Sequence, residues 1–341
     1  MRRENNKKHV YIGGGMFLCF LFTFILAVTV GSLKIPILDI FRVIGHHTIG
    51  FPHQVDPTSD AVLWSLRFPR VLLAMVVGAS LALAGVLYQG VLRNPLADPY
   101  ILGVSSGSAT GAIIAILSGI GAGIWGMWFI SLASFLGATI ATVSVFFLAG
   151  RELRTNTLIL AGVVIHALFG AVITFLLSMS VEQMSRIQYW LMGSFSLREW
   201  AHIWILIPII LVVMGVAWFT QRELNLFAVN ARTAANVGVS VKKTRFLLLI
   251  LASFLTAIVV SISGMIGFVG IVIPHLIRMI IGANYRFLIP YSILAGATFM
   301  MLSDLLARTL LEPRELPVGV ITAFLGAPIF SYFLYKWRRN L

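Results

Sequence analysis

The main pattern in the chain is the alternation of long apolar runs with short polar connections. A helix needs about 20 residues to cross the hydrocarbon core of a bilayer, and most of the apolar runs have about this length. The pattern predicts ten membrane-spanning helices, at residues 11–31, 68–91, 100–118, 124–149, 156–180, 201–220, 246–263, 266–282, 287–308 and 317–335. We therefore expect an all-α, polytopic membrane protein with one domain over residues 1–341.

One polar interval stands out between two of these runs. It is Gln221 to Arg245, with the sequence QRELNLFAVNARTAANVGVSVKKTR. Its apolar residues alternate with asparagines and arginines as in short amphipathic helices, and Gly238 fits a C-terminal helix stop. Two interpretations follow. The interval is either a helical hairpin that lies against its own protein or the lipid headgroups, or a docking surface for a soluble partner.

The composition excludes a soluble two-domain protein, because 59% of the residues are hydrophobic and only 11% are charged. The net charge of +13 raises the question of nucleic-acid binding. If both termini face the cytoplasm and the ten spans alternate, 17 of the 25 lysines and arginines lie inside, and the outside has no net charge. The positive-inside rule expects this distribution. The charge therefore predicts cytoplasmic termini, not a nucleic-acid partner.

The first span and the outer connection after it show no sign of chemistry. The first apolar run follows a basic N-terminus but is too long for a signal peptide, so we expect it to be retained. Its Cys19 is the only cysteine, which excludes an intramolecular disulfide. The connection Ser32 to Ser65 holds His46, His47 and His53 close to two aspartates. A metal site is one reading, but the spacing matches no tight motif, so we expect a solvated loop.

Arginines and aromatic residues mark the predicted outer side. Arg67 and Arg70 begin the second span, and Arg308 lies near the outer end of the ninth. They are either interfacial anchors with snorkelling stems or a basic patch for an acidic partner. The segment Val181 to Trp200 contains the cluster Gln188, Tyr189 and Trp190. This cluster fits an interfacial aromatic belt or the lining of a substrate vestibule.

Two glycine-rich spans predict the internal architecture. The third span, 100–118, is too polar to face lipid, and the eighth, 266–282, is short and interrupted by glycines and Pro274. Spans two to five begin outside and spans seven to ten begin inside. The two halves are therefore candidates for an inverted repeat, with broken helices in corresponding positions.

The chain lacks the motifs of an enzyme that drives transport itself. It contains no GxxxxGK[ST] phosphate loop and no HExxH. Asp304 is the only carboxylate within a predicted span. Ion-driven carriers place ionisable groups near the midplane, so an ion-coupled secondary transporter is only a remote alternative. The pattern favours a transport subunit that takes its energy from a partner.

Three separated stretches resemble one known family. They are LRFPRVLLAMVVGASLALAGVLYQGVLRNPLADPYILGVSSGSATGA, GMIGFVGIVIPHLIRM and ELPVGVITAFLGAPIF, in the order in which the family has them. The chain resembles the permease subunits of ABC importers for iron-siderophores, haem and vitamin B12. The resemblance runs nearly end to end and implies the inverted-repeat architecture of type II ABC importers.

The resemblance also implies partners. We expect a second permease subunit, identical or paralogous, two cytoplasmic ATPase subunits and an extracytoplasmic substrate-binding protein, in a bacterial cytoplasmic membrane. We expect no cofactor on this chain, because ATP and Mg are used by the partner ATPase. An iron(III)-siderophore is the expected cargo, with haem and vitamin B12 as alternatives.

Three groups of site residues follow from the resemblance. The ATPase would dock within the cytoplasmic coupling segment 221–245, at Leu224, Asn225, Phe227, Asn230, Ala231, Arg232, Ala234, Ala235, Asn236 and Gly238. The binding protein would dock at Arg67, Arg70 and Arg308, and the cytoplasmic gate would be formed by Asn94, Leu96, Thr155 and Asn156. Asn156 departs from the small hydroxyl residue that the family leads us to expect there.

Overall fold

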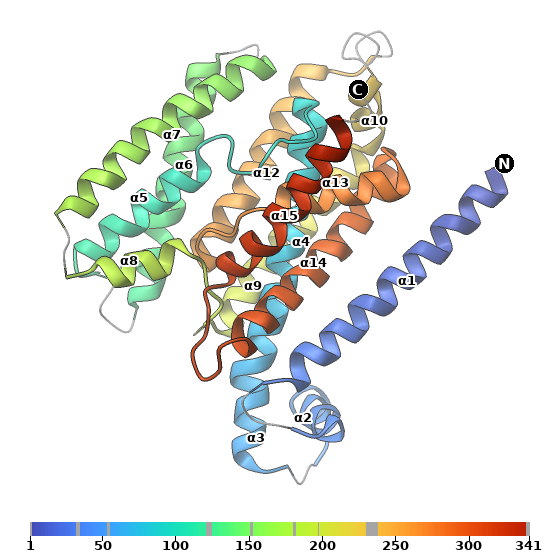
Figure 1. Cartoon of the computed structure of the whole chain (residues 1–341), viewed down its shortest axis with the longest axis vertical. Coiled ribbons are helices and arrows are strands. Elements are labelled where there is room, and N and C mark those ends of the chain that lie inside the picture. Colours follow the sequence, from blue (N-terminus) through green and yellow to red (C-terminus); the bar gives the residue numbers. More distant parts are fainter. Residues whose placement is uncertain are drawn as a thin grey trace.

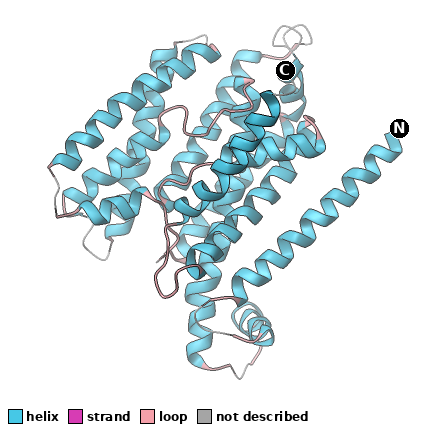
Figure 2. Ribbon diagram, in the orientation of Figure 1, coloured by secondary structure: helices cyan, strands magenta, loops and turns pink. Residues whose placement is uncertain are grey.

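The computed structural model describes residues 2–31, 35–52, 55–120, 125–150, 153–179, 182–196, 198–229 and 238–338. Within these ranges every regular element is a helix (Figure 2). Seven helices are long and apolar enough to cross a membrane, and three shorter apolar helices accompany them. The long ones contain α1 (Arg2–Thr29), α4 (Phe68–Leu92), α6 (Gly126–Ala149), α7 (Thr155–Ser178), α9 (Trp200–Phe219), α12 (Val241–Ser263) and α14 (Tyr285–Thr309). The shorter apolar stretches are α5 (Val104–Leu117), α13 (Val269–Ile281) and residues Val318–Phe333 of α15 (Val318–Arg338). These ten helices coincide with the ten predicted spans.

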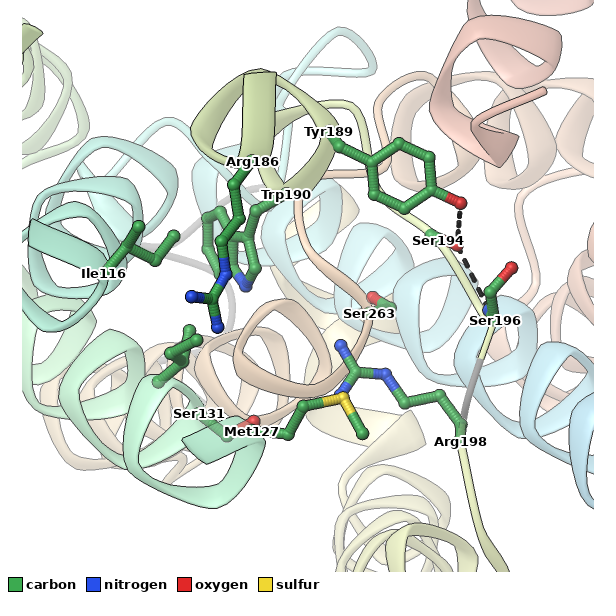
Figure 3. Close-up of a pocket in the computed structure, with 11 residues that line it drawn as sticks. Ile116, Met127, Ser131, Arg186, Tyr189, Trp190, Ser194, Ser196, Arg198 and Ser263 are labelled. Carbon is green, nitrogen blue, oxygen red and sulfur yellow. Dashed lines mark hydrogen bonds between the residues drawn. The ribbon is translucent and has the colours of Figure 1, made fainter. Parts of the chain in front are cut away.

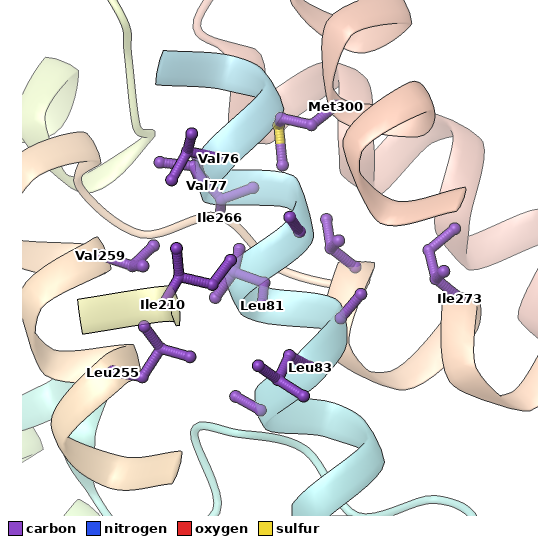
Figure 4. Close-up of a cluster of buried hydrophobic side chains, with 14 of the residues drawn as sticks. Val76, Val77, Leu81, Leu83, Ile210, Leu255, Val259, Ile266, Ile273 and Met300 are labelled. Carbon is purple, nitrogen blue, oxygen red and sulfur yellow. The ribbon is translucent and has the colours of Figure 1, made fainter. Parts of the chain in front are cut away.

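Helix α4 is the centre of the bundle. Almost all of its residues are buried, and it packs against α9, α12, α13 and α14 (Figure 4). Gly78 faces the backbone of Gly296 on α14, and Gly85 faces the backbone of Gly270 on α13. A Cβ atom at Gly78 or Gly85 would overlap the carbonyl oxygen opposite. Small residues at these crossings let the helices approach closely, which stabilises helix packing where lipid offers no hydrophobic driving force.

A second group of helices, α5, α6, α7 and α8 (Met184–Leu191), lies beside this centre and is green in Figure 1. Helices α5 and α6 cross closely because Gly107 faces Gly137. A hydrogen bond of 2.7 Å between the buried hydroxyls of Ser108 and Ser134 joins the same pair. Helix α12 contacts α4 on one side and α5 and α6 on the other, so it connects the two groups.

Helices α5 and α13 are the broken spans. They have 14 and 13 residues, fewer than the roughly 20 that a full crossing needs. Each is preceded by an irregular segment that ends in a left-handed residue, Gly103 at φ 74° and Phe268 at φ 69°. The two segments meet, because the Tyr100 hydroxyl donates to the Ile266 carbonyl (2.9 Å) and accepts from the Ile266 N–H (3.0 Å). This correspondence agrees with the predicted inverted-repeat architecture.

The segment 32–65 is not the solvated loop that we expected. It contains α2 (Ile37–Ile49) and α3 (Pro57–Ala61), and α3 continues through a π-helical turn, η1 (Val62–Arg67), into α4. Ile40 and Val43 recur at helical spacing and are buried, which fixes one face of α2 against the protein.

The histidines of this segment have structural roles. His47 Nε2 lies 3.1 Å from the Asp60 carboxylate, and its ring stacks on Trp64. His46 Nδ1 lies 2.9 Å from the carbonyl oxygen of Phe51. His53 lies outside the described residues. No group of three or more potential metal ligands forms in the part of the chain that the structure describes.

The bundle has two distinct ends. Helices α2 and α3 lie at one end, and α10 (Gln221–Val229) and the C-terminus lie at the other (Figure 1). We refer to these as the α2 end and the α10 end. The predicted outer connection and the predicted cytoplasmic segment are therefore at opposite ends, as the alternation of spans requires.

Candidate functional site

The α2 end brings together the three predicted outer arginines, which we call the arginine cluster. Arg70 is held by two carboxylates. Its Nε donates to Asp304 Oδ1 (2.9 Å), and its Nη1 donates to the Glu315 carboxylate (2.9 Å). Arg308 Nε lies 3.2 Å from Asp304 Oδ2, and its Nη2 donates to the Ala27 carbonyl (2.8 Å). The side chain of Asp304 is only 1% exposed, so the single carboxylate within a predicted span is buried between two arginines.

Arg67 completes the cluster. Its Nη1 donates to the carbonyl oxygens of Val28 and Thr29 at the end of α1, and the residue is 5% exposed. The cluster thus joins α1, α4, α14 and the segment before α15. The three arginines line a cavity of about 610 Å³ together with Arg198, Glu312 and Glu315. They lie close together and are largely buried against groups of this chain, and their role in docking a binding protein stays a prediction.

Glu315 is the accessible carboxylate of the cluster, with a side chain that is 40% exposed. Burial alone would raise the pKa of Glu315, but the hydrogen bond from Ser196 and the charge of Arg70 outweigh it and hold this pKa below its ordinary value. The Ser196 hydroxyl donates to Glu315 Oε2 at 2.6 Å. Glu315 therefore remains ionised and fixes the segment before α15 to α4.

The coupling segment is described only in part. Leu224 and Phe227 on α10 are buried, and α10 packs against α4, α9 and α14. Asn225 accepts from the Tyr285 N–H (3.0 Å) and donates to the Asn284 side chain (3.3 Å). Leu224, Asn225 and Phe227 therefore hold α10 on the bundle, and their predicted role in ATPase docking stays a prediction. Gly238 has φ 85°, a left-handed conformation that glycine adopts readily, and residues 230–237 lie outside the described ranges.

The four predicted gate residues lie in two separate turns. Asn94 Oδ1 accepts from the Leu96 N–H (3.0 Å) in the turn after α4, whereas Thr155 and Asn156 begin α7. Among the described residues no hydrogen bond joins the two turns directly. Arg245 on α12 lies beside the second turn, where its Nη1 donates to the Leu153 carbonyl (2.8 Å). Leu96 also lines a cavity of about 250 Å³ with His275, Arg278, Phe330 and Phe333.

Asp98 lies in the first of these turns. Its Oδ1 accepts from the Tyr100 N–H (3.0 Å), but burial dominates and raises the pKa of Asp98 to about 6. The carboxylate therefore changes charge near neutral pH, in the irregular segment that leads to α5.

A second cavity toward the α2 end was not identified from the sequence. It measures about 460 Å³ and lies among α5, α6, α8 and the segment before α9 (Figure 3). Its lining includes Arg186, Tyr189, Trp190, Ser194 and Arg198. The aromatic pair was noted in the sequence as a candidate vestibule. Arg186 and Arg198 could have been found as two further cations on the predicted outer side, where the positive-inside rule expects few.

The helical bundle and its paired broken spans are those of a polytopic membrane protein. The chain belongs to the FecCD transport family, whose family model matches residues 19–336. It is an ABC importer permease of the type that includes the vitamin B12 permeases, as the three sequence stretches predicted. Permeases of this family are transport components that work with a partner permease, an ATPase and a binding protein.

Several relatives match over most of their length. An uncharacterized ABC transporter permease, YvrB of Bacillus subtilis, is 39% identical over 100% of this chain and 97% of its own. The molybdate import permease MolB of Haemophilus influenzae is 36% identical over 96% of each chain. The cobalamin import permease BtuC of Halobacterium salinarum is 41% identical over 82% of this chain and 75% of its own.

A solved structure has the same fold. It is an inward-facing conformation of an ABC transporter assigned to the metal-chelate type, with a TM-score of 0.83 and 35% sequence identity. The match covers 96% of this chain and 99% of the solved one.

Proposed function

We propose that the chain is the permease of a bacterial importer for a metal chelate, with an iron(III)-siderophore as its cargo. The observation that carries this proposal is the end-to-end likeness in fold and sequence to the transporter assigned to the metal-chelate type. Arg186 and Arg198 in the cavity of about 460 Å³ are consistent with this proposal, because many metal chelates carry negative charge. Vitamin B12 is the second candidate, which the cobalamin permease of Halobacterium salinarum supports.

The proposed assembly has two permease subunits, two ATPase subunits at the α10 end and a substrate-binding protein at the α2 end. The excess of lysine and arginine on the α10 side supports a cytoplasmic position for that end and for both termini. In this assembly the partner ATPase binds ATP and Mg, and this chain provides the path through the membrane.

The coupling segment would transmit the motion of the ATPase. Leu224 and Phe227 are buried, so α10 moves together with α4, α9 and α14. Residues 230–237 are the proposed contact with the ATPase. Nucleotide shifts the permease between outward- and inward-open states only to the extent that it favours one of them. The proposed gate, at Asn94, Leu96, Thr155 and Asn156, closes the cytoplasmic side in the outward-open state.

The arginine cluster is the proposed docking site for the binding protein. Because Arg70 and Arg308 already contact Asp304 and Glu315, an incoming carboxylate competes with these partners. Reversing the charge with Arg67→Glu and Arg70→Glu should weaken binding of the binding protein and reduce uptake. The matched control is Arg42→Glu on α2, where the side chain is 49% exposed. Equal affinities for the control and the cluster variant would refute the docking role.

Purification of the whole complex tests the proposed cargo. The permease, expressed with its neighbouring ATPase and binding protein, should co-purify with both, and mass spectrometry of the bound ligand should show an iron(III)-siderophore. A corrinoid in its place would favour the vitamin B12 alternative. A permease that binds no ATPase would contradict the proposed assembly.

A further inference from the structure

The cavity in Figure 3 lies where several chain segments end. Ile116 comes from the end of α5, Met127 from the start of α6, and Ser263 from the end of α12. Helix α8 contributes Arg186, Tyr189 and Trp190, and the segment before α9 contributes Ser194, Ser196 and Arg198. Ser196 and Arg198 also line the cavity of the arginine cluster. The two cavities are therefore neighbours at the α2 end.

Among the described residues, Arg198 has no carboxylate partner. Its Nη1 donates to the sulfur of Met127 (3.3 Å), and its buried Nε has no hydrogen-bond partner in this part of the chain. Burial lowers the pKa of Arg198 to about 10, with the nearby Tyr189 acting in the opposite direction. A guanidinium has five N–H donors, and a buried cation is costly unless it is paired. Arg198 thus differs from Arg70, which two carboxylates neutralise in the neighbouring cavity.

The other polar groups of the cavity add positive potential and donors. Arg186 extends from α8 toward the same space as Arg198 (Figure 3). The hydroxyls of Tyr189 and Ser194 lie 3.1 Å apart and face this region. The cavity lining includes two arginines and, among the described residues, neither aspartate nor glutamate. A purely structural cavity would be more stable with apolar residues at these positions.

The cavity is connected by backbone hydrogen bonds to the end of α12 and the start of α15. The Ser194 N–H donates to the Ser263 carbonyl at the end of α12 (2.8 Å). The carbonyl oxygens of Met192 and Gly193 accept from Gly319 and Val318 at the start of α15 (3.1 Å each). A ligand held by Arg198 would therefore lie against the segment that fixes the ends of α12 and α15.

We propose that this cavity is a binding subsite for a soluble, oxygen-bearing anion, a carboxylate or small oxyanion, with Arg198 as its principal ligand and Arg186 as the second cation. The assignment of that anion to the cargo rests on the proposed import function. Charge-assisted hydrogen bonds from guanidinium to such an anion supply the partner that Arg198 lacks.

Citrate is a suitable probe, because it presents carboxylates and is small enough for about 460 Å³. The purified full-length chain in zwitterionic lipid nanodiscs would be titrated with citrate, against sodium chloride at equal ionic strength. The affinity would be measured by calorimetry. We expect saturable binding to the unmodified chain and an affinity at least about tenfold weaker for Arg198→Gln. Arg198→Lys should recover part of the loss, because it restores the charge but not the planar donor set.

The matched control is Arg42→Gln, which removes an exposed arginine on α2 and should leave citrate affinity unchanged. Unaltered citrate affinity in Arg198→Gln would overturn the proposal. A titration with sodium chloride that releases the same heat as the titration with citrate would overturn it as well. If Arg198→Gln does not purify as a monodisperse protein, citrate affinity is measured for Arg186→Gln and Arg198→Lys instead. Unchanged citrate affinity in both variants would also overturn the proposal.

A lipid headgroup offers similar chemistry, and a second arm separates the two sources. If the site takes a soluble anion, citrate affinity in nanodiscs that contain phosphatidylglycerol should stay within about twofold of the affinity in zwitterionic nanodiscs. Loss of citrate binding in the phosphatidylglycerol nanodiscs would overturn that assignment. The titration needs neither ATPase nor binding protein. Its failure would therefore leave the proposed import function standing, and failure of import would leave the anion site standing.

Discussion

Replacing Asp304 by asparagine removes the carboxylate that Arg70 and Arg308 share. Asp304 lies 2.9 Å from Arg70 Nε and 3.2 Å from Arg308 Nε, and its side chain is 1% exposed. The asparagine keeps the volume and one acceptor but no charge. In this variant Arg70 still contacts the Glu315 carboxylate. Arg308 keeps its hydrogen bond to the Ala27 carbonyl but loses the carboxylate that neutralises its charge.

The expected loss of stability follows from this geometry. Removing one partner of a buried ion pair costs about 3–5 kcal/mol. Because Glu315 still neutralises Arg70, we expect the lower value, about 3 kcal/mol. With an unfolding entropy of about 2.1 cal/mol/K per residue, the whole chain would have about 0.7 kcal/mol/K. The unfolding temperature should therefore fall by about 4 °C.

Thermal unfolding of the detergent-purified chain, followed by intrinsic fluorescence, would measure this shift. The matched control is Asp39→Asn, which breaks the exposed ion pair with Arg42 and should change the temperature by less than about 1 °C. Equal shifts in the two variants would show that Asp304 is not the anchor of the arginine cluster. Rescue of Asp304→Asn by Arg308→Met would support the reasoning, because it removes the charge left unpaired.

Three other predictions concern packing, pH and assembly. Gly85→Ala should destabilise the chain by about 1–3 kcal/mol, because the new Cβ atom overlaps a carbonyl oxygen of α13. The control is Gly170→Ala, where the Cβ atom meets open space and should not destabilise the chain. Thermal unfolding of the two variants measures the difference. The pKa of Asp98 is raised from 3.8 to about 6, so its carboxylate destabilises the fold above pH 6, and this effect is lost as the pH falls toward 4. Asp98→Asn should thus raise the unfolding temperature at pH 7.5, by an amount that shrinks at pH 5. Ala231→Asp with Ala234→Asp should prevent co-purification with the ATPase; normal assembly would refute docking there.

The apolar pattern predicted the spans because each helix that faces lipid must be apolar along its whole length. The broken spans were visible for a related reason, since glycines and serines in an apolar run indicate contact with protein. The positive φ of Phe268 was not predictable. The Phe268 side chain lies against Gly326 on α15, a contact that the local sequence does not contain.

The candidate sites were predicted less completely. The sequence places Arg67, Arg70 and Arg308 near one side of the membrane, but the pairing of Arg70 with Asp304 joins residues 234 positions apart. Local charge patterns therefore could not distinguish a free basic patch from an internal network. Arg198 was missed for the same reason, because the residues around it come from five segments that meet only in the fold.

The most direct test of the central claim is transport in proteoliposomes. The chain would be reconstituted with its ATPase and binding protein, and uptake of an iron(III)-siderophore would be followed with radioactive iron. We expect uptake that requires ATP and Mg, and that stops when the ATPase is omitted. Uptake by the permease alone, driven by a proton or sodium gradient and indifferent to ATP, would contradict the account.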